Sequence, residues 1–193
     1  MVEAVLEDEI KDENYDEGMN NTHDYNIGIM RQNFKNTREE VSHSCRSYKE
    51  QDINQVLKIS KQNTSYSRFV KDKLFKKFLK FPFRYYWLKN FFKGNLKNNL
   101  IVCQIKNKIT GFLLLNKEKK KLTIDLICTS KNYRGQKVAS SMIAYVHNRF
   151  MIKDKLYLIA GTQNYNTAAL KFYKKNNFKK TGKMYIYHSI IKN

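Results

Sequence analysis

Apolar and polar residues follow one another in a pattern that predicts helices and strands only after about residue 44. Helices are expected where apolar residues recur every three or four positions, and strands where short apolar runs stand between polar turns. The expected helices cover residues 52–57, 71–80, 87–94, 135–150 and 166–175, and the expected strands cover 100–105, 109–115, 122–128, 156–160 and 183–191. This order predicts an α/β fold in which helices flank a central mixed, mostly antiparallel sheet.

Residues 1–44 differ from the rest of the chain in both charge and pattern. They contain 11 of the 17 acidic residues and only four of the 37 basic ones, so residues 45–193 have a large positive excess. The first part also has little periodicity and few large aliphatic residues, so burial of apolar surface cannot offset the entropy lost on ordering it. We therefore expect a flexible acidic tail over 1–44 and one folded domain over 45–193.

The net charge of +20 suggests a polyanionic partner, and nucleic acid is the first hypothesis to test. However, 30 of the basic residues are Lys and only seven are Arg. Specific recognition of phosphates and bases favours the planar fork of Arg. A basic surface suits coenzyme A or a nucleotide-linked substrate equally well, since both are polyanions. We therefore expect no specific nucleic-acid partner.

The sequence lacks the features of a membrane or disulfide-framework protein. No apolar run approaches the roughly 18–20 residues of a membrane-spanning helix, and the first twenty residues contain no apolar signal region. Cys45, Cys103 and Cys128 lie far apart without metal-binding or redox spacing, which is typical of a reducing compartment. The four histidines likewise show no metal-ligand spacing. We expect a soluble cytoplasmic protein that needs no metal.

The segment 128–143 joins an expected strand to an expected helix through a short polar loop. The backbone N–H groups at a helix N-terminus, together with the positive end of the helix dipole, bind anions such as pyrophosphate. Arg134, Gln136 and Lys137 add donors around this point, and the small Ala139 leaves room at the first helical turn. On its own, this pattern is equally typical of an ordinary strand–loop–helix junction.

Together with a second motif, this segment resembles the coenzyme A loop of the GNAT acetyltransferases. The family pattern Arg/Gln-x-x-Gly-x-Gly/Ala begins here at Arg134 and ends at Ala139, with Lys137 in place of the middle glycine. The family pattern Asn-x-x-Ala-x-x-x-Tyr-x-x-x-Gly-Phe begins at Asn166 and has Asn177 in place of its glycine. Asparagine tolerates left-handed backbone angles, so the second change is the milder one. The resemblance implies a GNAT fold and acetyl-CoA as co-substrate.

The same resemblance implies roles for individual residues. Tyr173 would protonate the departing thiolate, and Asn166 would bond the cofactor or the substrate, although Asn166 is an equally good N-cap for its helix. Backbone groups of 126–128 would pair with the pantetheine arm and polarise the thioester carbonyl. The residues expected to contact the cofactor are Leu126, Ile127, Cys128, Arg134, Gly135, Gln136, Lys137, Val138, Ala139, Asn166, Ala169, Phe172 and Tyr173.

Four short segments point to a class of acceptor. Residues 66–75, 85–90, 159–173 and 185–191 resemble segments of N-acetyltransferases that act on dTDP-linked amino-deoxysugars, of the TDP-fucosamine type. The likeness covers roughly 45–193 and implies that the acceptor is the amine of a nucleotide sugar used in polysaccharide biosynthesis. The residues expected to bind this substrate are Ser67, Arg68, Asp72, Tyr86 and Trp87.

The general base is less clearly indicated than the general acid. Asp125 is the main candidate, acting directly or through water on the attacking amine. A solvent-facing position in an antiparallel strand is an equally good explanation for this residue. His188 is a weaker candidate, because a histidine in a terminal strand is more often structural.

Two other functions stay open at this point. A protein or peptide N-acetyltransferase of the same fold would act on a chain N-terminus or a lysine; the six acids in 45–193 argue against a strongly cationic acceptor. A noncatalytic module would bind coenzyme A or nucleic acid without turnover, and the changes at Lys137 and Asn177 keep this alternative open. The number of subunits is open as well, a homodimer included.

Overall fold

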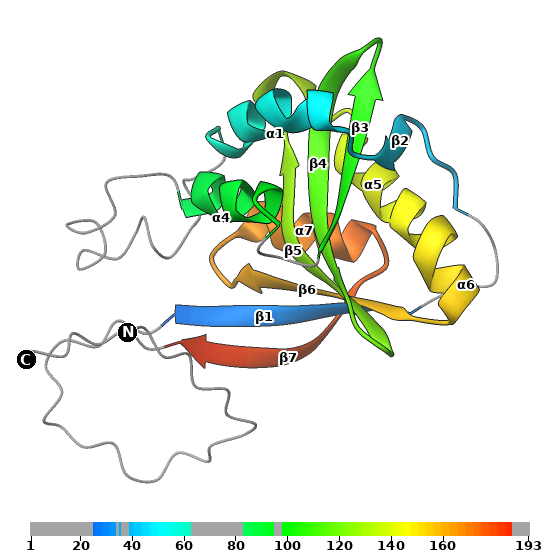
Figure 1. Cartoon of the computed structure of the whole chain (residues 1–193). Coiled ribbons are helices and arrows are strands. Elements are labelled where there is room, and N and C mark those ends of the chain that lie inside the picture. Colours follow the sequence, from blue (N-terminus) through cyan, green and yellow to red (C-terminus); the bar gives the residue numbers. More distant parts are fainter. Residues whose placement is uncertain (1–24, 34, 36–38, 63–82, 95–97, 187–193) are drawn as a thin grey trace, which may run out of the picture.

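The computed structural model of the chain describes residues 25–33, 35, 39–62, 83–94 and 98–186. Within them a seven-stranded sheet has the strand order β2-β3-β4-β5-β6-β1-β7. Neighbouring strands are antiparallel except for β5 and β6, which are parallel. Helices lie on both faces of the sheet (Figure 1), so the predicted α/β fold with a mixed, mostly antiparallel sheet is confirmed.

The elements have the following bounds. The strands are β1 (Tyr25–Gln32), β2 (Ser44–Ser47), β3 (Asn99–Ile105), β4 (Lys108–Lys117), β5 (Lys121–Thr129), β6 (Tyr157–Gln163) and β7 (Lys179–Ile186). The helices are α1 (Ile53–Ser60), α4 (Phe83–Phe92), α5 (Val138–Val146), α6 (Ile152–Asp154) and α7 (Thr167–Lys175). Among the described residues, no helix has the length and apolar character needed to cross a membrane.

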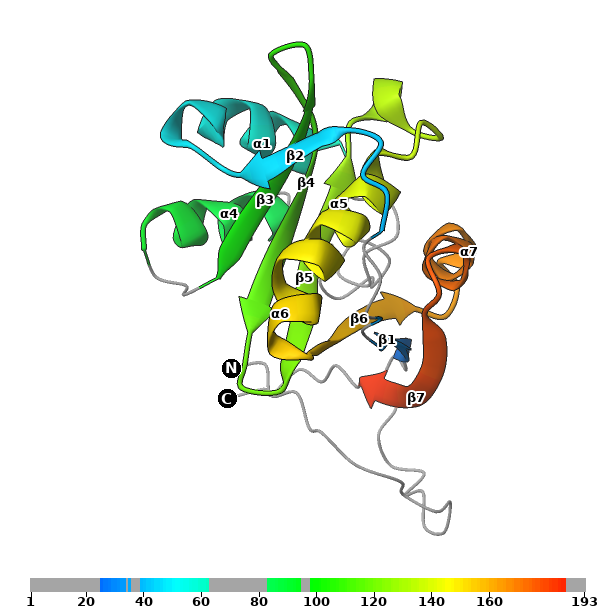
Figure 2. The same ribbon diagram turned by 90° about the vertical axis from the view of Figure 1, so that its right-hand side faces the viewer.

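Two apolar clusters hold the layers together, one on each face of the sheet. On one face α1 and α4 pack against β3, β4 and the end of β5, around the fully buried Phe112 and Leu88. On the other face α5 and α7 pack around Met142, Leu113 and Leu158, which are also fully buried. Figure 2 shows the sheet between these two helical layers. Burial of an aliphatic or aromatic side chain contributes roughly 1.5–3 kcal/mol, so these clusters supply most of the stabilisation.

Most of the predicted elements are confirmed. The strands expected over 100–105, 109–115 and 122–128 are present as β3, β4 and β5, which form an antiparallel meander. Helices α1, α4, α5 and α7 occupy predicted segments, and strand β6 follows α5 and α6 as expected. The helix predicted over 71–80 lies outside the described residues. So does the end of the strand predicted over 183–191, of which β7 supplies the beginning.

The predicted domain boundary at residue 44 is wrong. Strand β1 lies inside the sheet, where it pairs with β6 on one side and with β7 on the other. Its register places Met30 opposite Ala160, and Met30 is fully buried. The segment was missed because its apolar residues are few and interrupted by glycine; pairing on both edges compensates for this weak pattern. The folded part therefore includes residues 25–32.

The connection from β1 to β2 is fixed to the helical layer behind the sheet. After α5 the helix widens into a π turn, His147–Met151, in which His147 is fully buried. The backbone N–H of Lys35 donates to Nε2 of His147 at 3.0 Å. The side-chain amide of Asn148 bonds both backbone groups of Glu39, accepting at 2.8 Å and donating at 2.7 Å. These bonds hold residues 35 and 39 against the helix.

The cysteines differ in part from expectation. Cys45 and Cys103 face each other across β2 and β3 and form a disulfide, although 58 positions separate them in the sequence. Their spacing gave no sign of this pairing, because strand register brings the two residues together. The argument for a reducing compartment from three separate cysteines is therefore lost. Cys128 is a free, buried thiol.

Candidate active site

The parallel strands β5 and β6 are paired over only the first part of their length. The ladder joins residues 121–124 to residues 157–160 and stops at the pair Ile124 and Ala160. On its other side β5 continues to pair with β4, where Leu115 faces Ile124 and Leu114 faces Leu126. Asp125 is therefore a β-bulge, and a bulge bends its strand. Beyond it a gap lies between β5 and β6, which we call the β5–β6 gap, residues 125–129 and 161–163.

The bulge also exchanges the faces to which β5 side chains point. Leu122 and Ile124 belong to the cluster under α5, whereas Leu126 and Cys128 belong to the cluster under α4. In the gap, the edge of 126–128 that faces β6 has no ladder with that strand. These are the residues whose backbone groups we expect to pair with a pantetheine arm.

The loop after β5 ends in a helix N-terminus that no side chain caps. A short 3-10 turn, Lys131–Tyr133, leads to Arg134 and Gly135, and α5 begins at Val138. Lys137 is the N-cap residue and makes no side-chain capping bond, so the first N–H groups of α5 are not bonded by it. Such a terminus binds anions through these groups and through the helix dipole.

Both residues that replace a family glycine have left-handed backbone angles. Lys137 has φ 60° and Asn177 has φ 62°. A left-handed residue other than glycine costs roughly 1–2 kcal/mol, less for asparagine. Lys137 therefore has a backbone conformation that glycine adopts more readily than other residues do.

Gly111 of β4 allows α5 to approach the end of β5, and the sequence gave only a weak sign of its role. A Cβ at this position would lie 2.9 Å from the carbonyl oxygen of Cys128 and 2.9 Å from Cγ1 of Val138. Neither atom is free to move, since one is backbone and Val138 is 1% exposed. A single glycine inside an apolar strand often marks such a close approach.

Tyr173 of α7 is a buried phenol beside the gap. It is 4% exposed, and its ring packs at 5.2 Å from that of Phe172 and 5.0 Å from that of Phe178. Burial raises the pKa of Tyr173 far above its ordinary value, and the Cys128 thiol raises it further, whereas the charge of Arg84 lowers it. The phenol is therefore protonated at every physiological pH and can act as a proton donor.

Asn166 is used at least in part for structure. Its side-chain oxygen accepts a hydrogen bond from the backbone N–H of Ala169 at 3.2 Å, which is the N-cap bond of α7. Ala169 and Phe172 are partly buried against the cluster under α5 and α7. Asn166 therefore caps α7, which is one of the two roles expected for it. The other role, a bond to the cofactor or the substrate, stays a prediction.

Asp125 lies at the bulge, where the paired part of β5 ends. Its carboxylate accepts a hydrogen bond from the side-chain amide of Asn98, a partner that the sequence did not indicate. Burial raises the pKa of Asp125, the Asn98 bond opposes this, and the charge of Glu118 adds to it. A carboxyl group whose pKa is raised is a stronger base than an ordinary one, which suits a general base.

The predicted substrate-binding residues are not brought together by the described part of the chain. Ser67, Arg68 and Asp72 lie outside it. Tyr86 is exposed on α4, whereas Trp87 packs against the apolar cluster beneath that helix and contacts the ring of Phe83 at 5.7 Å. The structure therefore gives no shared binding surface for Tyr86 and Trp87.

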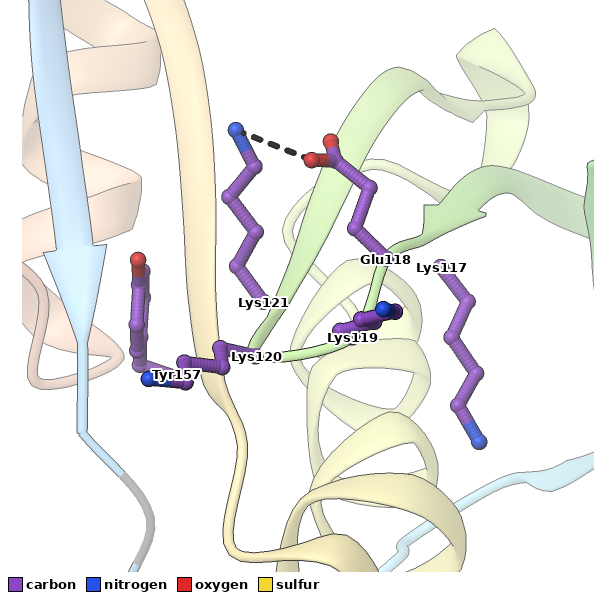
Figure 3. A pocket seen from close by; sticks show the side chains of 6 residues that line it. All are labelled: Lys117, Glu118, Lys119, Lys120, Lys121 and Tyr157. Carbon is purple, nitrogen blue, oxygen red and sulfur yellow. Dashed lines mark ion pairs between the residues drawn. The ribbon is translucent and has the colours of Figure 1, made fainter.

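A hollow of about 950 Å³ lies away from the β5–β6 gap, at the turn between β4 and β5. It is lined by Lys117, Glu118, Lys119, Lys120, Lys121 and Tyr157 (Figure 3). Two of its lysines are paired, Lys117 with Asp154 at 2.6 Å and Lys121 with Glu118 at 3.2 Å. The hollow is at the opposite end of β5 from Cys128, so it is separate from the candidate site. No group of three potential metal ligands occurs in the part of the chain that the structure describes.

The arrangement of a bulged strand, a diverging parallel neighbour and an uncapped helix N-terminus defines a GNAT fold. Residues 97–180, slightly less than half of the chain, match the family model described as "Acetyltransferase (GNAT) domain". Over these residues the chain is therefore similar to a GNAT acetyltransferase domain. No protein of curated function matches the sequence.

Solved structures show the same fold at low sequence identity. An acetyltransferase from the GNAT family of Colwellia psychrerythraea has a TM-score of 0.60 at 14% identity, over 86% of this chain and 56% of its own. A functionally unknown conserved protein from Staphylococcus epidermidis has a TM-score of 0.65 at 14% identity, over 88% and 64%. The ribosomal-protein-alanine N-acetyltransferase of Brucella melitensis has a TM-score of 0.54 at 14% identity, over 76% and 99%. The chain thus spans less than two thirds of the first two.

Proposed function

We propose that this chain is an N-acetyltransferase that moves an acetyl group from acetyl-CoA to a primary amine. One observation carries this proposal more than any other: a buried, protonated phenol, Tyr173, lies beside the gap where β5 leaves β6. The gap offers an unpaired backbone edge to a donor molecule, and the phenol offers a proton to its leaving group. The acetyltransferase domain match over 97–180 supports the same reaction.

The residues around the gap suit acetyl-CoA. Leu126, Ile127 and Cys128 would pair through their backbone groups with the amides of the pantetheine arm, much as a further strand would. The first N–H groups of α5, at Val138 and Ala139, would bond the pyrophosphate. Arg134, Gly135, Gln136 and Lys137 surround this point, and Arg134 lies near enough to Cys128 to lower the pKa of its thiol.

The side chains at the gap divide the proton transfers of the reaction between them. The amine must lose a proton to attack the thioester carbon, and Asp125, directly or through water, would accept it. The carbon–nitrogen bond then forms, the carbon–sulfur bond breaks, and its electron pair leaves with the sulfur. Tyr173 would donate its phenolic proton to that sulfur. The proton taken from the amine returns to Tyr173 through solvent, so the side chains end as they began.

The acceptor that we propose is the amino group of a nucleotide-linked amino-deoxysugar. The likeness of four short segments to amino-sugar acetyltransferases supports it, and so does the positive excess over residues 45–193, since a sugar nucleotide is an anion. A cytoplasmic location belongs to the same proposal, because acetyl-CoA is supplied there. A second candidate is a protein N-acetyltransferase, since one structure with this fold is that of a ribosomal-protein-alanine N-acetyltransferase from Brucella melitensis.

A panel of acceptors tests this proposal. Release of thiol from acetyl-CoA would be followed with dTDP- and UDP-linked amino-sugars, lysine peptides, peptides with free alanine N-termini, and spermidine. We expect turnover with one or more amino-sugar nucleotides and none with spermidine. Turnover with peptides alone would replace the acceptor class and keep the reaction. Failure to bind acetyl-CoA in calorimetry would contradict the proposed reaction, and binding without any turnover would favour a noncatalytic module.

A further inference from the structure

The last residues of β6 form one wall of the β5–β6 gap. Gln163 ends this strand, beyond the last pair of the parallel ladder, Ile124 and Ala160. On its other side Gln163 stays in the sheet, because it pairs with Ile27 of β1. Its backbone carbonyl accepts a hydrogen bond from the backbone N–H of Asn166 at 2.9 Å, at the turn into α7. The backbone of Gln163 is thus held beside the gap by two different contacts.

Alternation along β6 places the side chain of Gln163 on the face of the sheet that α1 and α4 cover. Leu158 and Ala160 belong to the cluster under α5 and α7, so the odd-numbered side chains of this strand point to the opposite face. Gly161, two residues before Gln163, lies on that same face. Among the described residues, a Cβ at Gly161 would meet one atom within 4 Å, Cγ2 of Ile27 at 3.3 Å. The described part of the chain therefore leaves space beside Gln163 on this face.

The side-chain oxygen of Gln163 is buried and has no hydrogen-bond partner among the described residues. The residue as a whole is 9% exposed. Burial removes the bonds that an amide oxygen makes to water, so folded proteins nearly always pair such an atom. An unpaired acceptor beside a gap in the sheet is therefore a place where a ligand could supply the missing donor.

Gln32 of β1 provides a contrast with Gln163. Its Oε1 is also buried and has no partner in the part of the chain that the structure describes. However, its Nε2 donates to the backbone carbonyl of Asn176 at 2.8 Å, at the end of α7. The side chain of Gln32 thus has a structural use. Within the described residues, no corresponding bond anchors the side chain of Gln163.

The chemistry of this oxygen selects the ligand that it can bind. An amide oxygen accepts hydrogen bonds and is not a base, so its partner must be an N–H or O–H group. In the proposed reaction, on which this inference rests, the thioester offers only acceptors, its carbonyl oxygen and its sulfur. The amides of the pantetheine arm are expected to pair with the backbone of 126–128. The donor that is left at the reacting centre is the amine of the acceptor molecule.

We propose that Gln163 binds the amine of the acceptor molecule. Its Oε1 accepts a hydrogen bond from one N–H of the amine and so directs the nitrogen lone pair toward the thioester carbon. Gln163 takes up no proton, and the bonds formed and broken are those of the proposed reaction. Because Oε1 has no partner to lose among the described residues, binding the amine there breaks no existing bond.

Two matched variants separate this role from a structural one without any turnover. Gln163→Met and Gln32→Met each replace a buried glutamine with an apolar side chain of similar length. Gln32→Met breaks the bond to Asn176 and should lower the urea midpoint of unfolding. Gln163→Met breaks no described bond and removes a buried polar oxygen, so its midpoint should be unchanged or higher. A midpoint lowered as far in Gln163→Met as in Gln32→Met would overturn the proposal.

Calorimetry tests the contact with the amine directly. The protein would first be saturated with coenzyme A, and the amino-sugar nucleotides and alanine peptides of the panel would then be titrated, each beside an analogue with hydrogen in place of the amine. We expect Gln163→Met to weaken binding of the amine by about 10-fold and binding of its analogue by less than about twofold. Coenzyme A itself should bind equally to parent and variant, and Gln32→Met should change neither affinity. Equal weakening of amine and analogue would overturn the proposal, as would a panel from which no amine binds.

Gln163→Glu adds a test by pH. Glutamate keeps an acceptor oxygen, so the amine should bind at least as tightly as it does to the parent. Its negative charge favours the protonated amine, so the profile of kcat/KM against pH should move to higher pH. In Gln163→Met, kcat/KM for the amine should fall by about 10- to 100-fold with the KM for acetyl-CoA within about twofold. Identical profiles in Gln163→Glu and Gln163→Met would contradict the contact.

These outcomes keep the amine site distinct from the proposed function. An amine that binds through Gln163 to a chain without turnover would keep the site and reject only the reaction. Turnover that Gln163→Met leaves unchanged would keep the reaction and reject the site.

Discussion

The two halves of strand β5 differ in the use of their backbone and side chains. Residues 122–124 are paired on both edges, with β4 and with β6, whereas residues 126–129 are paired with β4 alone. The first half points Leu122 and Ile124 into the cluster under α5, and the second points Leu126 and Cys128 into the cluster under α4. One bulged residue, Asp125, separates a half that stabilises the sheet from a half whose backbone can bind a ligand.

A single strand can therefore contribute both to the stability of the fold and to ligand binding when its pairing with one neighbour stops partway. Changes in the paired half should then reduce the free energy of unfolding and leave catalysis nearly intact. Changes around the gap should impair catalysis or the binding of acetyl-CoA, whether or not they also reduce stability. Four substitutions test this division, and the largest effect is expected at the gap.

Tyr173→Phe removes one oxygen atom at the gap and keeps the aromatic ring. We expect kcat to fall by about 100-fold or more, since general acid–base catalysis contributes roughly 10²–10⁴-fold. The ring contacts with Phe172 and Phe178 persist, so the free energy of unfolding should change by less than about 1 kcal/mol. Steady-state thiol release gives the first quantity and urea unfolding the second. Unaffected turnover would show that Tyr173 is not the acid.

Leu122→Ala tests the paired half. Leu122 is fully buried under α5, and deleting such a side chain costs about 2–5 kcal/mol of unfolding free energy. We expect kcat, measured well below the melting temperature, to stay within about twofold of the parent. The matched control is Leu126→Ala, the same change beyond the bulge, where a rise in the KM for acetyl-CoA should accompany the lost stability. Equal effects on KM in the two variants would remove the division between the halves.

The sequence predicted the meander, the helices α1, α4, α5 and α7, and the loop before α5, because each of these has a strong local pattern. Leu100 to Ile105 and Ile109 to Leu115, for example, are apolar runs separated by a polar turn, and nearby pairing fixes them. Tyr173 was found because it belongs to a motif of fixed spacing. The roles proposed for it and for the other cofactor residues stay predictions.

The remaining features depend on register, which no local pattern contains. Strand β1 pairs with β6 and β7, which lie more than a hundred residues later in the chain, so weak periodicity at 25–32 gave no warning. The pairing of Cys45 with Cys103 follows from the same kind of long-range contact. The hydrogen bond between Asn98 and Asp125 likewise joins residues 27 positions apart in the sequence. Spacing along the chain cannot predict contacts that the packing of layers creates.

Asp125→Asn tests the junction between the two halves and should have the smallest effect on stability. Burial raises the pKa of Asp125 above its ordinary value of 3.8, so the folded state binds this proton more tightly than the unfolded state does. Stability therefore falls as pH rises through the interval between the unfolded and the folded pKa, and it stays lowered above that interval. An asparagine lacks this proton and still accepts from Asn98, so the variant should be slightly more stable at neutral pH, by less than about 1 kcal/mol.

The activity of this variant should change in the other direction. If Asp125 takes the proton of the amine, kcat/KM of the parent enzyme falls as the pH drops below the pKa of Asp125. Asp125→Asn should lack this fall and should be slower than the parent at every pH. Urea unfolding at several pH values between 4 and 8 measures the stability difference, which should shrink toward zero as the pH falls. A difference that does not vary with pH would contradict the raised pKa. A gain of stability together with a loss of activity would show that the carboxylate of Asp125 serves the reaction at the gap and lowers the stability of the fold.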